Sequence, residues 1–293
     1  MTIIAILLAF ALCHFIRELG QVRNHQWLHK WIGIADNAFS KLPSWQDLTG
    51  YLIILFIPVL LLGLLNQLVL TAFGTLGVFL LAIAVLVYTF GPRDLDTQVA
   101  DLIAAPEGPE RERAHAALLR GEVPDDQEAS RGATVGAVFS EALHRWFGII
   151  FWFAVLGVVG AFLYRVVDWL ACERTHLSDG QKHLFLRTRQ ILDWPAAQLM
   201  TLSLAIATDF DSVFAAWKTY HDEQGHGLFE GDNGFLLASA RQIVLTGHAA
   251  QDGYADQLDG PLSCLKQSMD LVWRILGVWM TVLALLLLID VVT

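Results

Sequence analysis

The sequence has little of what soluble, nucleic-acid-binding or disulfide-linked proteins contain. Only 16% of its 293 residues are charged, whereas soluble domains carry about a quarter. The three cysteines, Cys13, Cys172 and Cys264, are far apart and odd in number, and no Cys-x-x-Cys pair occurs, which indicates neither a disulfide framework nor a zinc site. The formal net charge of −10 argues against a nucleic-acid partner, because such a protein presents a basic face.

Catalytic signatures are also absent. The sequence contains no Gly-x-x-x-x-Gly-Lys phosphate loop, no Gly-x-Ser-x-Gly, no His-Glu-x-x-His and no Gly-x-Gly-x-x-Gly. No internal repeat of the kind found in transporters is evident. Short motifs therefore name no reaction, and composition becomes the main guide.

Hydrophobic sequence is abundant. Hydrophobic residues make up 55% of the chain, and the mean hydropathy is +0.50. We therefore predict an all-α, polytopic membrane protein, because a helix satisfies its own backbone polar groups in lipid. The N-terminal apolar run has no basic region before it and no cleavage site after it. Residues 1–16 are therefore expected to remain as a first membrane helix.

About four full spans are expected. Residues 48–70 and 71–90 follow the first one and form a helical hairpin, because the turn between them is too short to hold a loop. The fourth span covers residues 271–292.

Two more apolar runs, 147–163 and 195–207, are shorter than the roughly 20 residues of a full span. The second is expected to start a new helix at Pro195, because the residue before a proline is biased away from helix. If both runs cross, the chain makes six crossings, and the basic segment 164–194 lies outside. If both re-enter, every basic segment is cytoplasmic, as the positive-inside rule prefers. Both arrangements stay open, with a slight preference for six crossings.

The segments between the spans are polar. Trp27, Trp31 and Ile34 recur at helical spacing within 17–47, which predicts an amphipathic helix on the membrane surface. Residues 106–134 are rich in Pro, Gly and charge and are predicted to be a mobile polar loop, with the next helix starting near Thr134. The whole chain, 1–293, is predicted to be one membrane domain with cytoplasmic helical loops.

Charged residues flank the run 147–163. Glu141 and Arg145 are four residues apart, and Arg165 and Asp168 are three apart, so each pair shares one face of a helix. Local ion pairs at the ends of a membrane helix are the simpler interpretation. A functional site is the alternative, because ionisable groups at the membrane edge are costly.

A second polar group follows the hairpin. Pro92 suits the first position of a helix, and Asp94 and Asp96 then meet the positive end of its dipole. Alternatively, these carboxylates form a cluster with Arg93 close to Glu141 and Arg145. In that case Asp94 and Glu141 are the candidate ligands for Mg²⁺, which takes one or two carboxylates together with phosphate oxygens.

Several short motifs together resemble one family. They are Phe90-Gly-Pro-Arg-Asp-Leu-Asp96, Glu141-Ala-Leu-His-Arg-Trp-Phe-Gly148, Tyr164-Arg165, Leu192-Asp-Trp-Pro-Ala196 and Asp209-Phe-Asp211. In this order they resemble the AmpE family, inner-membrane proteins encoded with the AmpD amidase of peptidoglycan recycling and described as modulators of β-lactamase induction. The resemblance implies a multi-pass protein of the bacterial inner (cytoplasmic) membrane with a functional link to AmpD.

AmpE is similar in turn to the CobD/CbiB proteins of cobalamin biosynthesis, which form an amide bond with ATP and Mg²⁺. This chain lacks about half of their polar motif residues. The resemblance implies that the residues it retains hold a small ligand such as a phosphate or nucleotide, with Mg²⁺ as a possible cofactor, since arginine binds phosphate bidentately. The candidate ligand-binding residues are Arg93, Asp94, Asp96, Glu141, Arg145, Tyr164, Arg165, Asp168, Asp209 and Asp211.

Two main functions follow from these residues. The first is a signalling modulator that binds a small ligand at a polar site at the membrane edge. The second is a Mg²⁺-dependent membrane enzyme that forms amide bonds. Whether the protein is an enzyme stays open, and no catalytic residue is assigned. The lipid bilayer is the expected partner in either case.

Overall fold

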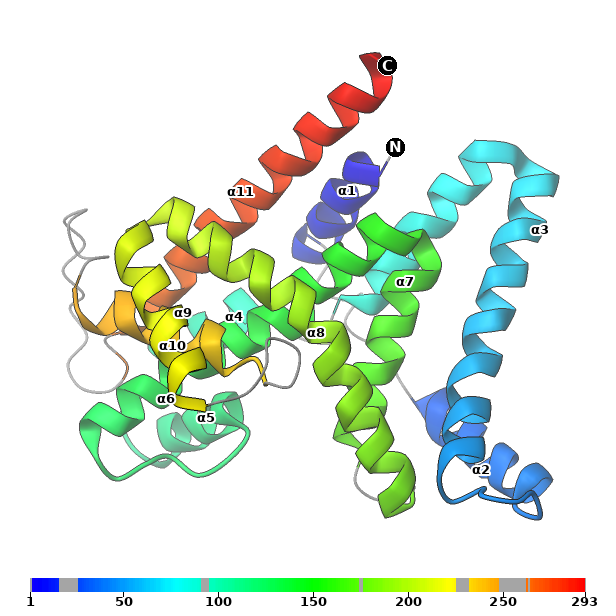
Figure 1. Cartoon of the computed structure of the whole chain (residues 1–293), viewed down its shortest axis with the longest axis horizontal. Coiled ribbons are helices and arrows are strands. Elements are labelled where there is room, and N and C mark those ends of the chain that lie inside the picture. The colour runs from blue at the N-terminus through cyan, green and yellow to red at the C-terminus, as the bar shows by residue number, and fades with distance from the viewer. Residues whose placement is uncertain are drawn as a thin grey trace. The chain divides into compact units, whose positions relative to one another are not determined.

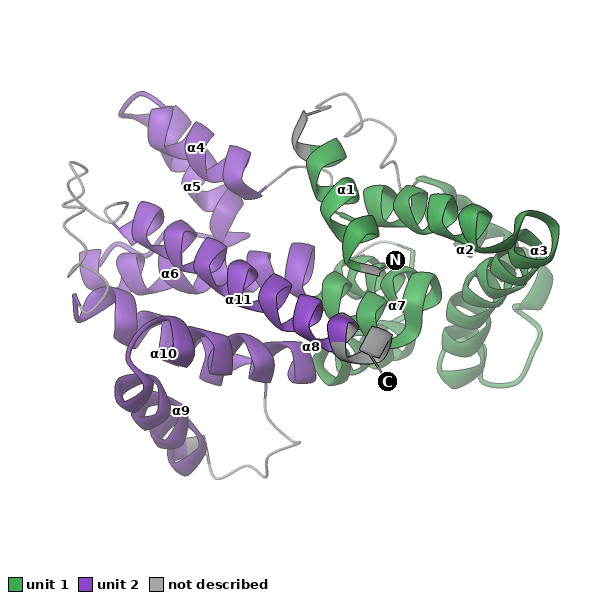
Figure 2. Ribbon diagram, turned by 90° about the horizontal axis from the view of Figure 1, so that it is seen from above, with its two compact units in different colours: residues 1–92, 148–193 green, residues 93–147, 194–293 purple. Residues whose placement is uncertain are grey.

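The computed structural model describes residues 2–15, 26–90, 95–173, 176–224, 232–247, 262 and 264–292. Within these residues the regular structure is helical throughout, as the sequence predicts, and no strand occurs. The chain packs as two compact units, and Figure 2 colours them separately. Unit 1 comprises residues 1–92 and 148–193, and unit 2 comprises 93–147 and 194–293.

Unit 1 is built from the first three helices, from α7 and from the first half of α8. Their bounds are α1 (Thr2–Phe15), α2 (Gln26–Phe39), α3 (Leu48–Thr89), α7 (Gly148–Cys172) and α8 (Asp179–Ala207), of which residues up to Asp193 belong here. The long helix α3 turns back on itself at Gly74, where φ is 64° and ψ is −157°. Figure 1 shows the two arms. The predicted hairpin is therefore present, with its reversal at Gly74 rather than between residues 70 and 71.

Helix α7 also reverses. Gly157 has φ 65° and ψ −149°, a combination that side chains other than hydrogen rarely permit. The arms 148–156 and 158–172 then run back past each other. A Cβ on Gly160 would overlap the Trp152 carbonyl, and a Cβ on Gly148 would overlap the Tyr164 ring. Gly148 and Gly160 therefore let the two arms of α7 approach each other closely.

The core of unit 1 holds α2 against α3, α7 and α8. Leu28, Ile32 and Ala35 of α2 are fully buried with Ile54 of α3 and Phe185 of α8. Burying a Leu or Ile side chain stabilises the fold by roughly 1.5–3 kcal/mol. The amphipathic helix predicted here exists, but Leu28, Ile32 and Ala35 form its buried face.

The aromatic residues expected to mark that face lie elsewhere on α2. Trp27 and Trp31 flank the buried face, and Trp31 Nε1 donates to the Ile54 carbonyl at 3.1 Å. Ile34 is 59% exposed. The Trp-based pattern therefore predicted the helix but not the side of it that packs.

Unit 2 contains the remaining helices and the second half of α8. They are α4 (Leu95–Ala104), α5 (Pro109–Leu119), α6 (Gln127–Ala142), the π-helical turn η2 (Leu143–Phe147), α9 (Phe210–Gln224), α10 (Gly234–Leu245) and α11 (Cys264–Val292). α6 begins at Gln127 instead of Thr134, because Asp126 caps it by accepting from the Ala129 amide at 2.8 Å. Much of the expected 106–134 loop is therefore helix.

Helix α8 differs from the sequence prediction as well. It runs without a break from Asp179 to Ala207 and contains Pro195, where a new helix was expected. A proline inside a helix removes one backbone hydrogen bond but does not always end it, and apolar helices tolerate it better than soluble ones.

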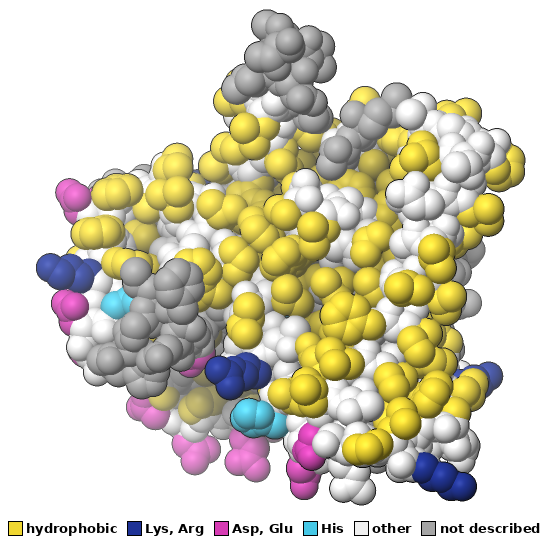
Figure 3. All heavy atoms as spheres, turned by 45° about the vertical axis from the view of Figure 1, so that its right-hand side comes forward, with side chains coloured by type: hydrophobic (Ala, Val, Ile, Leu, Met, Phe, Trp, Pro, Cys, Tyr) yellow, Lys and Arg dark blue, Asp and Glu magenta, His cyan; other side chains and the backbone are white. Residues whose placement is uncertain are grey.

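Three helical stretches among the described residues are long and apolar enough to cross a membrane, namely Leu48–Thr89, Gln127–Cys172 and Cys264–Leu286. α1 is apolar but has 14 residues, which is shorter than a typical span of about 20. Leucines and other large apolar side chains of α3 are exposed, and Figure 3 shows hydrophobic side chains covering the α3 part of the surface. Such a surface suits contact with lipid.

Candidate functional site

The predicted site residues fall into separate units. Asp96, Glu141 and Arg145 belong to unit 2, and Tyr164, Arg165 and Asp168 belong to unit 1. Arg93 and Asp94 lie outside the described residues. The described residues of this set therefore contribute to two polar clusters, one within each unit.

The unit 2 cluster is centred on Glu141, near the end of α6. Its side chain is only 4% exposed and is held between two arginines. Arg120 Nε lies 2.5 Å from one carboxylate oxygen, and Arg145 Nη2 lies 2.6 Å from the other. A buried carboxylate without such partners would destabilise the fold by several kcal/mol. The pair with Arg145, predicted from the four-residue spacing, is confirmed.

Local backbone geometry positions both arginines. Arg120 ends α5 in the left-handed conformation, with φ 54° and ψ 27°, and its amide donates to the Ala116 carbonyl. Arg145 lies in the π-helical turn η2, and π-helical turns occur frequently at functional sites. Arg120 comes from another helix, and no spacing rule in the sequence indicated it.

This arrangement limits what Glu141 can bind. A cation at Glu141 would have to displace Arg120 or Arg145, since both oxygens already face a guanidinium. Asp96 is half-buried in the first turn of α4, where the helix dipole favours a carboxylate. The proposed Mg²⁺ pairing of Asp94 with Glu141 stays a prediction.

The unit 1 cluster joins the returning arm of α7 to α8. Arg165 Nη1 donates to Asp168 Oδ2 at 3.0 Å, which confirms the pair predicted from the three-residue spacing. Two residues of α8 complete the group. Arg189 Nη1 lies 3.7 Å from Asp168 Oδ1, and Arg189 Nε lies 4.0 Å from Asp193 Oδ2. Tyr164 Oη donates to Asp193 Oδ1 at 2.6 Å.

The result is a buried chain of alternating charges. Arg165 is 7% exposed, Asp168 5% and Asp193 2%. Two arginines and two aspartates balance formally. The Leu192-Asp-Trp-Pro motif contains Asp193, but nothing in the sequence indicated that α8 would supply it to a cluster with Tyr164.

Hydrogen bonding in this cluster is incomplete. Arg165 Nε, Arg189 Nε and Asp168 Oδ1 are buried and make no hydrogen bond with any residue that the structure describes. Separations of 3.7 and 4.0 Å are too long for direct bonds. Buried polar atoms are nearly always satisfied by protein, water or ligand. Two donors and one acceptor are therefore available here to a bound group.

Asp209 and Asp211 have a local structural role in unit 2. Asp209 precedes α9, and its carboxylate accepts from the Ser212 amide at 3.2 Å and from the Ser212 hydroxyl. Asp211 is exposed in the first turn of α9. Both positions are typical of a helix N-terminus.

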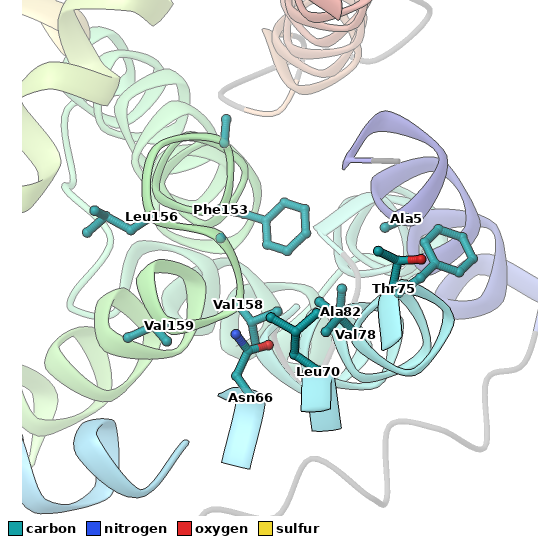
Figure 4. A pocket seen from close by; sticks show the side chains of 13 residues that line it. Ala5, Asn66, Leu70, Thr75, Val78, Ala82, Phe153, Leu156, Val158 and Val159 are labelled. Carbon is teal, nitrogen blue, oxygen red and sulfur yellow. The ribbon is translucent and has the colours of Figure 1, made fainter. Parts of the chain in front are cut away.

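Unit 1 also contains a cavity of about 370 Å³ near the two reversals. Figure 4 shows Asn66 and Thr75 as the polar groups among the apolar side chains around it, with Phe153 and Val158 contributed by the two arms of α7. Asn66 Oδ1 is buried and makes no hydrogen bond with a described residue. The cavity suits a small apolar group that donates one hydrogen bond.

The geometry thus gives one neutralised carboxylate in unit 2 and one partly satisfied ion network in unit 1. Comparison of the chain with protein-family models, curated proteins and solved structures finds no match.

Proposed function

We propose that the chain is a membrane-embedded signalling modulator of the bacterial inner membrane, linked to peptidoglycan recycling and β-lactamase induction. The single observation that supports a binding role is the buried Tyr164–Arg165–Asp168–Arg189–Asp193 network, whose atoms are only partly hydrogen-bonded. The pathway itself comes from the resemblance to the AmpE family.

A modulator needs two alternative arrangements, and the network offers them because Asp168 has two alternative arginine partners. Asp168 pairs with Arg165 on its own helix and lies 3.7 Å from Arg189 on α8. A small movement of α8 would tighten the second pair at the expense of the first. A ligand that prefers one arrangement then shifts the packing of α7 against α8, since a ligand moves an equilibrium only through its differential affinity.

The available atoms define the ligand's chemistry. A carboxylate or phosphate would accept from Arg165 Nε and Arg189 Nε, and an ammonium or hydroxyl group would donate to Asp168 Oδ1. Small wall-derived peptides carry both kinds of group. We therefore propose a fragment of that class as the ligand, in keeping with the functional link to the AmpD amidase.

The reversal at Gly157 bears on the membrane topology. A segment that turns back after nine residues suits re-entry better than crossing. We propose that 147–163 re-enters, that both arms of α3 and helix α11 are full spans, and that the basic segment 164–194 faces the cytoplasm. This agrees with the positive-inside rule.

The functional test uses single substitutions in a strain that depends on the protein. Asp168→Asn and Arg165→Gln are expected to abolish the effect of the protein on β-lactamase induction while leaving its amount in the membrane unchanged. Asp179→Asn, which alters an exposed aspartate on α8, is the matched control. Direct binding of a wall peptide to purified protein should be lost in the same two variants. Full complementation by both variants would refute the role of the network.

Topology is tested separately by cysteine labelling in a background without the native cysteines. Single cysteines at the exposed positions Arg187 and Asp125 are compared. Re-entry predicts that an impermeant reagent reaches both from the same side of the membrane. Labelling from opposite sides would show that the 147–163 segment crosses.

A further inference from the structure

A second cluster in unit 1 contains two histidines and one buried glutamate, and it is separate from the network proposed above. His29 comes from α2, Glu173 follows α7, and His176 lies three residues further along. Their ligand atoms all lie within 4.8 Å of one another. The sequence offers only a Glu-x-x-His spacing for this group, and the third residue is 144 positions away.

The distances suit a metal ion. Glu173 Oε2 is 3.5 Å from His29 Nδ1, and Glu173 Oε1 is 3.4 Å from His176 Nδ1. Tetrahedral zinc binds nitrogen and carboxylate oxygen at about 2.0–2.2 Å, which puts neighbouring ligand atoms about 3.3–3.5 Å apart. The two histidine–glutamate separations therefore match those of neighbouring zinc ligands, with each imidazole facing a different carboxylate oxygen.

Burial and ring packing support the same conclusion. The Glu173 side chain is only 8% exposed and lies against both imidazoles. His29 Nδ1 is buried and makes no hydrogen bond with a described residue. The Trp169 ring packs edge-on against His29 at 4.7 Å, and the two imidazole centroids are 4.5 Å apart. An ion between these groups would satisfy His29 Nδ1.

The donor set selects the class of metal. Imidazole nitrogen favours zinc and the later first-row metals, whereas Mg²⁺ prefers oxygen. Two histidines and one glutamate leave a fourth position for water, as in open zinc sites. We propose that His29, Glu173 and His176 bind one divalent transition-metal ion, zinc by preference, and that the ion fixes α2 to the connection between α7 and α8.

This inference is independent of the signalling role, and its test uses binding alone. Full-length protein in detergent, purified without a histidine tag and stripped with a chelator, is titrated with Zn²⁺ against a chromophoric chelator. We expect one zinc ion per chain. Glu173→Gln and His176→Ala should each weaken binding at least tenfold, because each removes a ligand. His176 is 46% exposed, so its truncation opens no core cavity.

Two control variants separate this site from adventitious binding. His183→Ala removes an exposed histidine on α8 and should leave the affinity within twofold. Cys172→Ser tests the neighbouring thiol, which contacts Arg189 Nη1 at 3.3 Å, and should also keep the zinc. Added Zn²⁺ should raise the thermal unfolding midpoint of the wild type and of His183→Ala, but not of His176→Ala. Equal zinc affinity in the wild type and His176→Ala, or no zinc bound by the wild type, would overturn the proposal.

Discussion

The reversal of α7 at Gly157 predicts that alanine at this position destabilises the protein, whereas alanine in place of a glycine inside an ordinary helix stabilises it. Gly157 has φ 65° and ψ −149°, and a Cβ there would meet no atom within 4 Å. Alanine would therefore introduce backbone strain without a clash. Strain of this kind is worth about 1–3 kcal/mol, and the lower entropy of the unfolded chain offsets about 0.4–1 kcal/mol of it. Gly157→Ala should lower the free energy of unfolding by roughly 1–2 kcal/mol.

If α7 were straight, Gly157→Ala would instead stabilise the protein. In a helix interior, replacing glycine with alanine stabilises by up to about 1 kcal/mol. Reversible unfolding in mixed detergent micelles, followed by circular dichroism, distinguishes the two signs. Gly74→Ala should behave like Gly157→Ala, because φ is 64° and the space around Gly74 is also open. Gly277→Ala in α11, where a Cβ again meets nothing, should stabilise. If Gly157→Ala and Gly277→Ala change stability in the same direction, α7 does not reverse at Gly157 and the reasoning is refuted.

Three further predictions concern unit 2. Glu141→Ala should lower the free energy of unfolding by about 3 kcal/mol or more, because it leaves two arginines without their buried carboxylate partner. Arg120→Ala should have a smaller effect, since Arg120 is 47% exposed. Denaturant unfolding of both variants shows which of them loses more stability. Burial and the hydrogen bond to Asp232 raise the pKa of Tyr220 to about 12, so its contribution to stability is present below pH 10 and lost as pH rises through 12. Tyr220→Phe should therefore remove one phenolate that titrates near pH 12 in ultraviolet absorbance. Burial lowers the pKa of His115 below its usual value of 6.5. The contribution of His115 to stability is therefore present above that pH and lost as the pH falls below it. The free energy of unfolding of His115→Gln should consequently depend less on pH between 5 and 7 than that of the wild type.

The sequence predicted the features that depend on hydrophobicity and helical period. The 42 residues of α3 are too long and too apolar for one crossing, so a hairpin is expected. Its exact position is decided by which glycine adopts a positive φ, and Gly63, Gly74 and Gly77 all lie in the run. Hydropathy does not distinguish between them. The reversal in α7 was harder still, because 147–163 is short enough to be either a crossing or a re-entry.

Capping and proline chemistry account for the other differences. The start of α6 is signalled by Asp126 followed by Glu128, but Pro, Gly and charge in the surrounding segment outweighed that signal. The prediction from sequence ended one helix and began another at Pro195, which is the effect that proline has in a water-exposed helix. In the structure it lies inside α8, between Trp194 and Ala196. Local rules therefore failed where the helix continues despite an unfavourable residue.

In the candidate sites, contacts within one helix were predictable from the sequence, and contacts between helices were not. Glu141–Arg145 and Arg165–Asp168 were predictable, because a helix fixes the spacing of residues three or four apart. Arg120, Arg189 and His29 were not, because each reaches its partner from another helix. Contacts between helices depend on where the chain turns, and periodicity alone does not contain that information.

The position of the unit 1 network follows from the Gly157 turn. With the arms of α7 folded together, Gly148 lies against Tyr164, and Trp152 Nε1 donates to the Leu192 carbonyl of α8 at 3.0 Å. A straight α7 would separate Gly148 from Tyr164 by about 24 Å, since each residue rises 1.5 Å. The first arm therefore packs beside α8, next to Asp193, only because the chain reverses. Under the signalling role proposed above, Gly157→Ala should disturb β-lactamase induction more than Gly74→Ala at equal loss of stability. Equal effects on induction would mean that the network does not depend on the turn.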